Sequence, residues 1–452
     1  MAKSIPSISR YYSIKNLKRF VSNPINVLKE YIEKKGDTFS IHISLNQKAI
    51  VSCNPDFIQH ILQKRHRNYH KSPIQTKTLS RYLGRNLLTS DGPYWLKQRR
   101  LIQPGFHRDR LTALVNIMLK EVDTFLDHLD KKVDTQNEIE IVHEMMEVAF
   151  RVVAKSLFST SLKEKDLNHL SANVTELQEF IIKQVRMPFL NPWFKISGQI
   201  KKMDQRTNES NKIVLGYISE RRNNKSDQND LLNMLLDARY EDTGEGMTDE
   251  QLLGETLILF VAGHETSANA LSWAWYLLSQ NEKVVAKIRE ELSTVLGDRD
   301  PIFSDFPKLT YLTQVIQETM RLYPPAWITD RISIEEDEIN GFPIPSNVMI
   351  APFIYGVHHH PDFWPNPEKF DPSRFEKDKV KQRHSYAYLP FGGGPRLCIG
   401  NNFAMMEMQL IIARMLQRYD FELVKNHPID LQPLVTLRAR HGIKLKIRKI
   451  KK

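Results

Sequence analysis

The segment from Thr248 to Gln280 predicts one long helix that is apolar on almost every face, and this feature constrains the fold most. Thr248, with Gln251 three residues later, has the pattern of a capping box at the start of the helix. A helix that is apolar all round has to be enclosed by other elements. We therefore expect a mainly helical fold, and a chain of 452 residues that is 41% hydrophobic can build the large core this requires.

The centre of this predicted helix is polar, with the sequence Ala262-Gly-His-Glu-Thr266. A glycine inside a helix costs about 1 kcal/mol relative to alanine. A buried glutamate costs more unless it is neutral or has partners. Because local conflicts of this kind often mark functional sites, the centre of the helix is a candidate site.

Periodicity and breaker residues predict the remaining elements. The predicted helices cover 91–108, 116–160, 172–222 and 311–323, with breaks at Pro104, Pro188, Pro192 and Pro324. The predicted strands lie at 39–44, 49–52, 331–345 and 434–447, and the polar tract 223–230 predicts a loop. The sequence has no linker and no repeat, so we expect a single domain over 1–452.

The net charge of +11 and the isoelectric point of about 9.3 fit a nucleic acid, an anionic membrane or an acidic protein as partner. No nucleic-acid motif supports the first of these. The sequence contains neither an apolar leader nor a run long enough to span a membrane. We therefore expect a soluble, cytoplasmic protein with no membrane anchor and no nucleic-acid partner.

The two cysteines lie in different settings. Cys53 is interpreted as a small buried hydrophobic residue. Zinc is not expected, because no second Cys or His lies at ligand spacing near either cysteine. Cys398 directly precedes a predicted helix start, where the helix dipole stabilises a thiolate.

Three consecutive glycines, Gly392 to Gly394, precede Cys398 and let the backbone approach a large flat group. Arg396 lies in the same loop and can hold an anion. A thiolate, a close-approach loop and an anion clamp describe a haem ligand with a propionate partner. They do not describe a cysteine protease, because no histidine base lies nearby.

The segment Phe391-Gly-Gly-Gly-Pro-Arg-Leu-Cys-Ile-Gly400 resembles the haem-binding signature of the cytochrome P450 family, Phe-x-x-Gly-x-Arg-x-Cys-x-Gly, at every fixed position. Further segments resemble this family in the right order: Trp95-Leu-Lys-Gln-Arg99, Ala262-Gly-His-Glu-Thr266, Glu318-Thr-Met-Arg321 and Phe370-Asp-Pro-Ser-Arg-Phe375. The resemblance covers nearly the whole chain. It implies a single-domain P450 fold, mainly α with small β-sheets, with haem between the long central helix and the cysteine-loop helix.

The resemblance also implies residue roles. Cys398 would be the axial thiolate ligand of the haem iron, and Thr266 with Glu265 would deliver protons to bound dioxygen. Gly263 would leave space for oxygen. The implied haem contacts are Phe391, Gly394, Gly400, Ala262 and Gly263, and the implied propionate ligands are Arg396, Trp95, Arg99 and Arg331.

Two structural groups and a substrate pocket follow from the same resemblance. Glu318 and Arg321 alone predict a weak surface pair, but the family pattern implies a buried network completed by Arg374. The consecutive histidines His358 to His360 are interpreted as structural, because adjacent side chains point apart. The implied pocket, covered by 176–200, is lined by Phe260, Ala326, Trp327, Ile328, Leu434 and Val435.

The implied activity is that of a haem-thiolate monooxygenase, which uses haem b and O2 to hydroxylate or oxidatively O-demethylate an organic substrate. Electrons would come from NAD(P)H through a separate ferredoxin or flavodoxin and its reductase, since no fused reductase is expected. The docking surface would comprise Lys377, Lys379, Lys381, Arg383, Lys97 and Arg100, unless these are only solvated. The alternatives are a peroxygenase or isomerase, which would not need Glu265 and Thr266, or a non-enzymatic haem-binding protein. The substrate stays open among fatty acids, terpenoids, methoxylated sugars and aromatic ethers.

Overall fold

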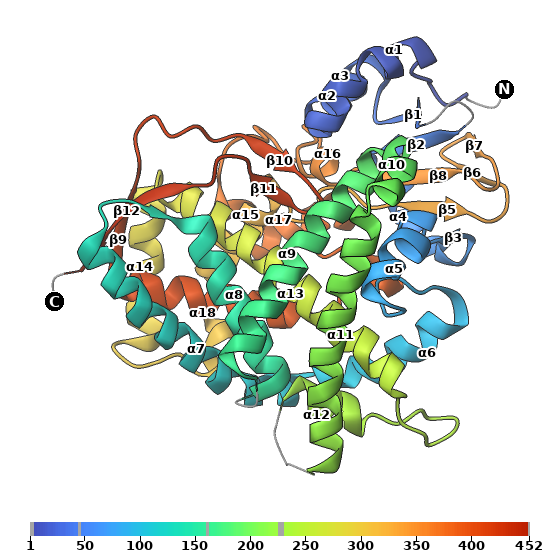
Figure 1. The fold of residues 1–452 in the computed structure, drawn as a ribbon. Coiled ribbons are helices and arrows are strands. Elements are labelled where there is room, and N and C mark those ends of the chain that lie inside the picture. The colour runs from blue at the N-terminus through green and yellow to red at the C-terminus, as the bar shows by residue number, and fades with distance from the viewer. Residues whose placement is uncertain (1–3, 44–46, 160–161, 225–229, 451–452) are drawn as a thin grey trace. The chain divides into compact units, whose positions relative to one another are not determined.

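The computed structural model describes residues 4–43, 47–159, 162–224 and 230–450 (Figure 1). The chain folds into two compact units. Unit 1 comprises 1–72, 313–399 and 429–441, and unit 2 comprises 73–312, 400–428 and 442–452. The predicted fold class, mainly helical with small sheets, is confirmed, whereas the single domain over 1–452 stays a prediction. Within the described ranges, none of the helices combines the length and the apolar character needed to cross a membrane.

Unit 1 contains the larger sheet, in the strand order β1-β2-β8-β5-β3. The strands of this unit are β1 (Thr38–His42), β2 (Lys48–Ser52), β3 (Tyr69–His70), β5 (Arg331–Ser333), β6 (Asp337–Ile339), β7 (Phe342–Ile344), β8 (Met349–Pro352), β10 (Leu431–Pro433) and β11 (Leu437–Ala439). Its helices are α1 (Arg10–Lys15), α2 (Leu17–Ser22), α3 (Pro24–Lys35), α4 (Pro55–Gln59), η1 (His60–Lys64), most of α15 (Thr310–Leu322), α16 (Ile354–His358), η8 (Pro372–Phe375) and α17 (Lys377–Gln382).

The sheet of unit 1 is buried on both faces around its central strands. β2 pairs antiparallel with β1 and parallel with β8, so it is a central strand. Accordingly Ala49, Ile50 and Val51 are all buried, without the alternation of a half-exposed strand. They form one core cluster with Phe57 and Phe353.

Unit 2 is almost entirely helical. Its helices are α5 (Ser80–Leu83), α6 (Gly92–Ile102), α7 (Arg108–Thr135), α8 (Ile141–Phe158), α9 (Glu164–Arg186), α10 (Asn191–Ile196), α11 (Gln199–Asn223), α12 (Leu231–Asp237), α13 (Asp249–Leu278), α14 (Glu282–Leu296) and α18 (Asn401–Arg418). Its strands β4 (Ile139–Glu140), β12 (Lys444–Lys449) and β9 (Tyr419–Leu423) form a small sheet in that order.

The long central helix predicted from the sequence is α13, the longest helix among the described residues. Its N-terminus has the predicted capping box between Thr248 and Gln251. The helices α8, α11 and α18 pack along it (Figure 1). Most of its side chains are buried, as expected for a helix that is apolar on every face.

The predicted helix over 116–160 is interrupted in the structure. α7 ends at Thr135, and the short strand β4 precedes α8 because Ile139 pairs with Leu445 of β12. This partner lies about 300 residues away, so local periodicity carries no signal for it. The predicted helix over 91–108 also ends early, at Ile102, where Pro104 begins a 3-10 turn. The predicted loop 223–230 lies mostly outside the described residues.

A buried carboxyl group lies where α18 packs against α13. Glu407 is fully buried, and no hydrogen bond to either carboxylate oxygen is found among the described residues. Burial raises the pKa of Glu407 to about 8, although the neighbouring Ser267 hydroxyl opposes the shift. Glu407 is therefore mostly protonated at neutral pH.

We expect Glu407→Gln to stabilise the protein more at pH 8 than at pH 5. The folded pKa lies above the unfolded value, so this group's contribution to stability is complete below about pH 4.5 and is lost as the pH rises through about 8. At about 1.4 kcal/mol per pKa unit, the difference amounts to a few kcal/mol. Melting temperatures of both proteins across this range test the prediction, with the exposed Glu422→Gln as control. If the difference in melting temperature between Glu407→Gln and the wild type did not change with pH, the prediction would be wrong.

Candidate functional site

The cysteine loop of unit 1 is fixed by backbone hydrogen bonds. The Gly392 N–H donates to the Leu389 carbonyl over 3.1 Å, and the Cys398 N–H donates to the Phe391 carbonyl over 3.0 Å. Phe391 is half-buried, whereas Cys398 is exposed. The loop thus holds its cysteine side chain outward on a closed backbone turn, three residues before α18 begins.

Gly394 is required by its surroundings. Its φ is +66°, and a Cβ on it would lie 1.9 Å from the carbonyl oxygen of Leu62 in η1. No other residue fits this position, because the backbone of η1 supports the loop from that side. By contrast, a Cβ on Gly392 or on Gly400, the N-cap residue of α18, would meet no described atom within 4 Å.

These observations fit a haem ligand set. An exposed cysteine can supply a thiolate to iron.

The centre of α13 in unit 2 presents a small exposed face. Ala262 is exposed and Thr266, one turn later, is half-exposed, in a helix that is otherwise buried. The Thr266 hydroxyl donates to the Ala262 carbonyl over 2.8 Å. Glu265 is buried, with 3% of its surface exposed, and His264 packs against Phe150. The helix face that carries Ala262 and Thr266 is thus open, whereas Glu265 and His264 lie within the core.

Gly263 is partly exposed and also packs against α8, and its expected role beside oxygen stays a prediction. A Cβ on this glycine would lie 3.1 Å from a methyl group of Val153 in α8. The glycine lets two helices approach closely, and the small exposed residue here is Ala262.

The four predicted propionate ligands lie on three elements. In unit 1, Arg396 is half-buried in the cysteine loop, and Arg331 is buried on β5, where it donates to the Asp330 carbonyl over 2.6 Å. In unit 2, α6 carries a buried Trp95 and a half-buried Arg99, whose Nε donates to Gln103 over 3.1 Å.

The structure brings Glu318, Arg321 and Arg374 together inside unit 1. Arg321 donates to both carboxylate oxygens of Glu318, over 2.7 and 2.8 Å, and both side chains are fully buried. Arg374 lies 3.3 Å from the same carboxylate. Burial raises the pKa of Glu318, and two guanidinium groups and a backbone N–H oppose this shift.

Aromatic and histidine side chains extend this network. The Trp364 ring lies 5.0 Å from the Arg321 guanidinium and 3.8 Å from that of Arg383. The Arg321 guanidinium also donates to the His358 carbonyl over 2.9 Å, and the Nε2 atom of His358 accepts the Leu389 N–H over 2.7 Å. The network thus reaches Leu389, at the start of the loop that carries Cys398. Sequence analysis treated His358 as structural but gave no signal for this contact.

The predicted pocket residues divide into buried and exposed members. Phe260 packs against Phe150 in the core of unit 2. In unit 1 the Trp327 indole is buried and donates to the Leu434 carbonyl over 2.9 Å, which joins the segments 326–328 and 434–435. Ala326, Ile328, Leu434 and Val435 are exposed or half-exposed.

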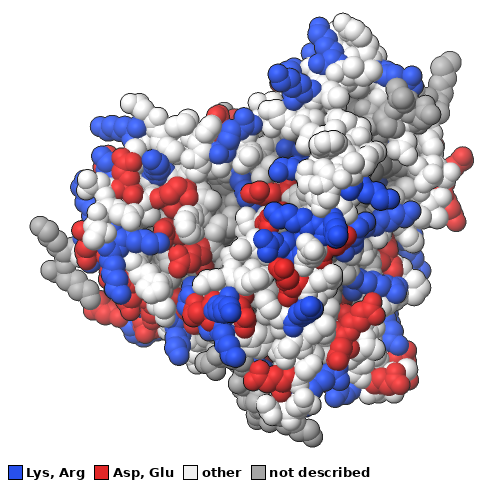
Figure 2. Space-filling model, in the orientation of Figure 1, with Lys and Arg blue, Asp and Glu red and all other residues white. Residues whose placement is uncertain are grey.

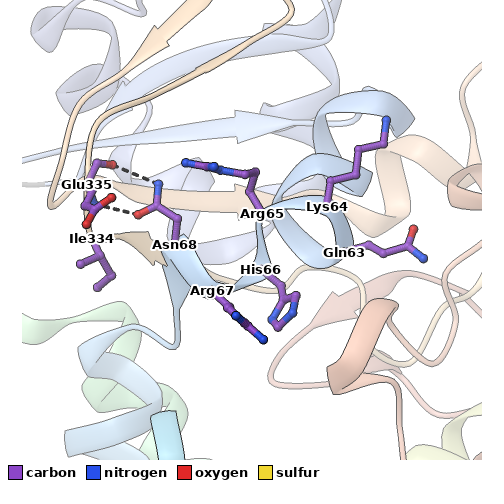
Figure 3. Close-up of a pocket in the computed structure, with 8 residues that line it drawn as sticks. All are labelled: Gln63, Lys64, Arg65, His66, Arg67, Asn68, Ile334 and Glu335. Atoms are coloured by element: carbon purple, nitrogen blue, oxygen red, sulfur yellow. Dashed lines mark hydrogen bonds between the residues drawn. The ribbon is translucent and has the colours of Figure 1, made fainter.

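A basic groove of about 540 Å³ lies in unit 1, and sequence analysis did not identify it. Figure 3 shows its lining, which consists of Gln63, Lys64, Arg65, His66, Arg67, Asn68, Ile334 and Glu335. Asn68 closes one end through hydrogen bonds of 3.2 and 2.8 Å to the Glu335 backbone. The run Lys64-Arg65-His66-Arg67 was the signal available in the sequence.

The groove lies beside the cysteine loop. Leu62, whose carbonyl faces Gly394, directly precedes the groove residue Gln63. The pKa of His66 is lowered, first by burial and then by the charges of Arg396 and Arg67. Among the described residues, neither Lys64 nor Arg67 has an acidic side chain within 4 Å, so the groove carries uncompensated positive charge.

The basic residues expected to dock a partner are mostly neutralised locally. Lys379 pairs with Glu376 over 3.1 Å, and Lys97 pairs with Asp242 over the same distance. Arg383 lies against Trp364, and burial lowers its pKa to about 10. In the view of Figure 2, blue basic and red acidic side chains are interspersed over the surface. Of the six residues, Lys97, Lys379 and Lys381 thus lie beside acidic side chains, and the docking surface stays a prediction.

Comparisons with known proteins agree with this geometry. The family model described as Cytochrome P450 matches residues 5–447. A cyclooctatin synthase from Streptomyces melanosporofaciens is 31% identical over 394 residues, which cover 86% of this chain and 83% of that protein. A cyclooctat-9-en-7-ol 5-monooxygenase from the same organism is 31% identical over 385 residues, covering 85% and 82%.

A solved structure shows the same fold. The crystal structure of the cytochrome P450DA heme domain superposes with a TM-score of 0.86 at 21% identity, covering 100% of this chain and 98% of that one. The family model spans nearly the whole chain, and the relatives include a protein named as a monooxygenase. The chain therefore belongs to the cytochrome P450 family and is a haem-thiolate monooxygenase.

Proposed function

We propose that this enzyme hydroxylates an alicyclic, largely hydrocarbon substrate, with Cys398 as the axial ligand of haem b. The observation that carries the proposal is the exposed cysteine on a rigid loop that only glycine can complete at position 394. When bound, haem with a thiolate ligand supplies the activation of O2 for insertion of one oxygen atom. The surrounding residues would bind the haem, orient the substrate and move protons.

Each proposed role rests on the chemistry of the side chain. Arg396 and Arg331 in unit 1 and Trp95 and Arg99 in unit 2 offer N–H donors for propionates. The Thr266 hydroxyl, which donates within α13, can also accept a proton at its oxygen and pass one on. The buried Glu265 carboxyl is the proposed source of that proton. This acid–alcohol pair favours a monooxygenase over a peroxygenase or an isomerase.

We expect Thr266→Ala to bind haem and substrate normally but to form less product per electron consumed, with hydrogen peroxide as the by-product. Loss of a general acid lowers rates by about 10²–10⁴-fold, so proton delivery becomes the step that fails. Product, NAD(P)H and peroxide are measured in one assay. Thr266→Ser, which keeps the hydroxyl, is the control. If Thr266→Ala kept the wild-type ratio of product to electrons, Thr266 would have no part in proton delivery.

The substrate class is proposed from the exposed residues and from the relatives. Ala326, Ile328, Leu434 and Val435 offer an apolar surface in unit 1. One relative is named for 5-monooxygenation of cyclooctat-9-en-7-ol, a cyclic alcohol. A compact ring system with few polar groups would bind to such a surface, because binding buries apolar area.

A binding screen tests the substrate class. Panels of cyclic terpenoid alcohols, fatty acids and methoxylated sugars are added to the ferric protein, and the spin-state change of the haem is recorded. Hits are then turned over under ¹⁸O2. We expect cyclic terpenoid alcohols to give the largest response and one labelled oxygen atom per product. A response confined to methoxylated sugars, with loss of the methyl group, would support oxidative O-demethylation instead.

We propose that the basic groove docks an acidic electron donor, a separate ferredoxin or flavodoxin that receives electrons from NAD(P)H through its reductase. The groove has uncompensated cations and adjoins the cysteine loop, whereas Lys379 and Lys381 of α17 are paired with neighbouring acids. Complementary charge raises the encounter rate between proteins. The groove therefore places an acidic partner beside the proposed thiolate ligand.

Reversing the groove charge is expected to slow the first electron transfer. Lys64→Glu with Arg67→Glu should lower its rate from ferredoxin or flavodoxin by about tenfold at low salt and flatten its salt dependence. The matched control is Lys379→Glu with Lys381→Glu, and reduction by dithionite reports intact haem. If the α17 variant were the slower one, or if the groove variant kept the wild-type rate, the groove would not be the docking site.

A further inference from the structure

Three potential metal ligands from distant segments meet inside unit 1. Asp37, Cys53 and His360 each offer one ligand atom, and these atoms all lie within 4.8 Å of one another. Cys53 and His360 are buried, and Asp37 is partly exposed. None of these residues belongs to the proposed haem site. No sequence pattern indicates the cluster, because Asp37 and His360 are about 320 residues apart.

The backbone fixes the positions of all three residues. Asp37 precedes β1 and Cys53 follows β2, and the Cys53 N–H donates to the Asp37 carbonyl over 2.9 Å. This bond continues the antiparallel register in which Thr38 pairs with Ser52. His360 follows α16, which is joined to the same strand pair because the Phe353 N–H donates to the Ser52 carbonyl over 2.8 Å. The cluster therefore does not depend on flexible side chains alone.

We propose that Asp37, Cys53 and His360 bind one zinc-type divalent cation, with water as the fourth ligand. A thiolate, an imidazole and a carboxylate are the donors that zinc prefers, and their two negative charges neutralise the ion. Zinc bonds of about 2.0–2.3 Å place tetrahedral donors about 3.5 Å apart, and here Nε2 of His360 lies 3.1 Å from Asp37 while all three donor atoms lie within 4.8 Å of one another. On binding, the Cys53 thiol releases its proton to solvent and the sulfur bonds the metal.

The surroundings supply an entry path and outer partners. The exposed side of Asp37 opens the cluster to solvent, where the water ligand would lie. The imidazole of His360 and, to a smaller extent, the amide of Asn54 lower the pKa of the Asp37 carboxyl. His360 Nε2 lies 3.1 Å from Asp37, and its Nδ1 lies 3.3 Å from the Asp362 N–H and 4.0 Å from the Asp362 carboxylate. The Asp362 N–H donates to Nδ1, which leaves Nε2 as the ring nitrogen that faces Asp37.

The bound cation would clamp the β1–β2 hairpin to the segment that follows α16. Without it, Asp37 and His360 form an ion pair beside a buried thiol. The protein with bound cation and the protein without it differ in metal content, in metal–sulfur bonding and in thermal stability. Each of these properties can be measured without turnover by the enzyme. Failure of this proposal is therefore separable from failure of the proposed hydroxylase function.

The test uses the haem-loaded full chain, purified without a polyhistidine tag, treated with a chelator and then given ZnCl2. After gel filtration, elemental analysis should find about one zinc per haem iron, and zinc should raise the melting temperature. X-ray absorption at the zinc edge should show one sulfur at about 2.3 Å. Cys53→Ser should remove this sulfur signal, and both Cys53→Ser and Asp37→Asn should bind zinc at least about tenfold more weakly.

The matched control is His441→Gln. His441 lies 3.2 Å from Asp430 in an exposed pair that has a comparable distance but no thiol, so its loss should leave zinc binding unchanged. If Cys53→Ser does not fold, the zinc content of Asp37→Asn alone tests the proposed site. Substoichiometric zinc in the wild type, zinc without a sulfur neighbour, or undiminished binding in Cys53→Ser or Asp37→Asn would each mean that the three residues form only an ion pair next to a thiol.

Discussion

Replacement of Cys398 by serine is expected to abolish the thiolate-type absorption of the reduced carbon-monoxide complex and to reduce turnover below detection. The loop of Cys398 is closed by its own backbone hydrogen bonds, so serine should leave the fold intact while removing the sulfur. A hydroxyl does not replace a thiolate as electron donor to iron. Absorption spectra of the reduced protein with carbon monoxide and product formation under O2 measure the two effects.

The control for this experiment is Leu397→Ala. Leu397 is also exposed and directly precedes Cys398, but it has no ligating atom, so the thiolate-type spectrum should be retained. If Cys398→Ser retained that spectrum as well, Cys398 would not be the axial ligand, and the proposed haem site would have to be abandoned.

Loss of either partner in the Glu318–Arg321 pair is expected to destabilise the protein by about 3–5 kcal/mol, because each change leaves a buried charge without compensation. Both side chains are fully buried, and their contact is bidentate. Arg321→Lys should also be destabilising, since lysine cannot make two parallel hydrogen bonds. Yield of folded protein, haem content and melting temperature provide the measurements for Glu318→Gln, Arg321→Ala and Arg321→Lys.

A second pair at the same spacing gives a matched comparison. Arg206 and Glu209 in α11 are also three residues apart and lie 3.1 Å from each other, but 35% and 44% of their side-chain surfaces are exposed. Arg206→Ala should therefore cost no more than about 1 kcal/mol. If Arg206→Ala and Arg321→Ala had equal effects on stability, burial would not be what makes the Glu318 pair important.

The contrast between these pairs shows what the sequence could predict. Both have an acidic and a basic residue three positions apart, and only the family resemblance of Glu318 and Arg321 suggested burial. The start and extent of α13 were predictable, because its capping box and its apolar faces are local properties. The interruption at β4 was not, because its partner β12 lies near the other end of the chain.

The predicted site residues show the same division between local and distant information. The glycine pattern around Cys398 is local, so the loop could be recognised from the sequence. The contact between Gly263 and α8 depends on how α8 packs against α13, and the pairing of α17 lysines with acids depends on side-chain placement. The meeting of Asp37, Cys53 and His360 needs the complete sheet of unit 1, so residue spacing argued against a metal site there.

The parallel pairing of β2 with β8 has a consequence for biosynthesis. Ser52 of β2 is in register with Pro352 of β8, so the strand emerges from the ribosome about 300 residues before its partner. At about 5–20 residues per second, the β1–β2 hairpin waits for about 15–60 s with one apolar edge uncovered. Uncovered edges of this kind pair with other chains. Recovery of folded protein should therefore rise when translation is fast relative to encounters between nascent chains, or when a chaperone covers this edge until Pro352 has been made.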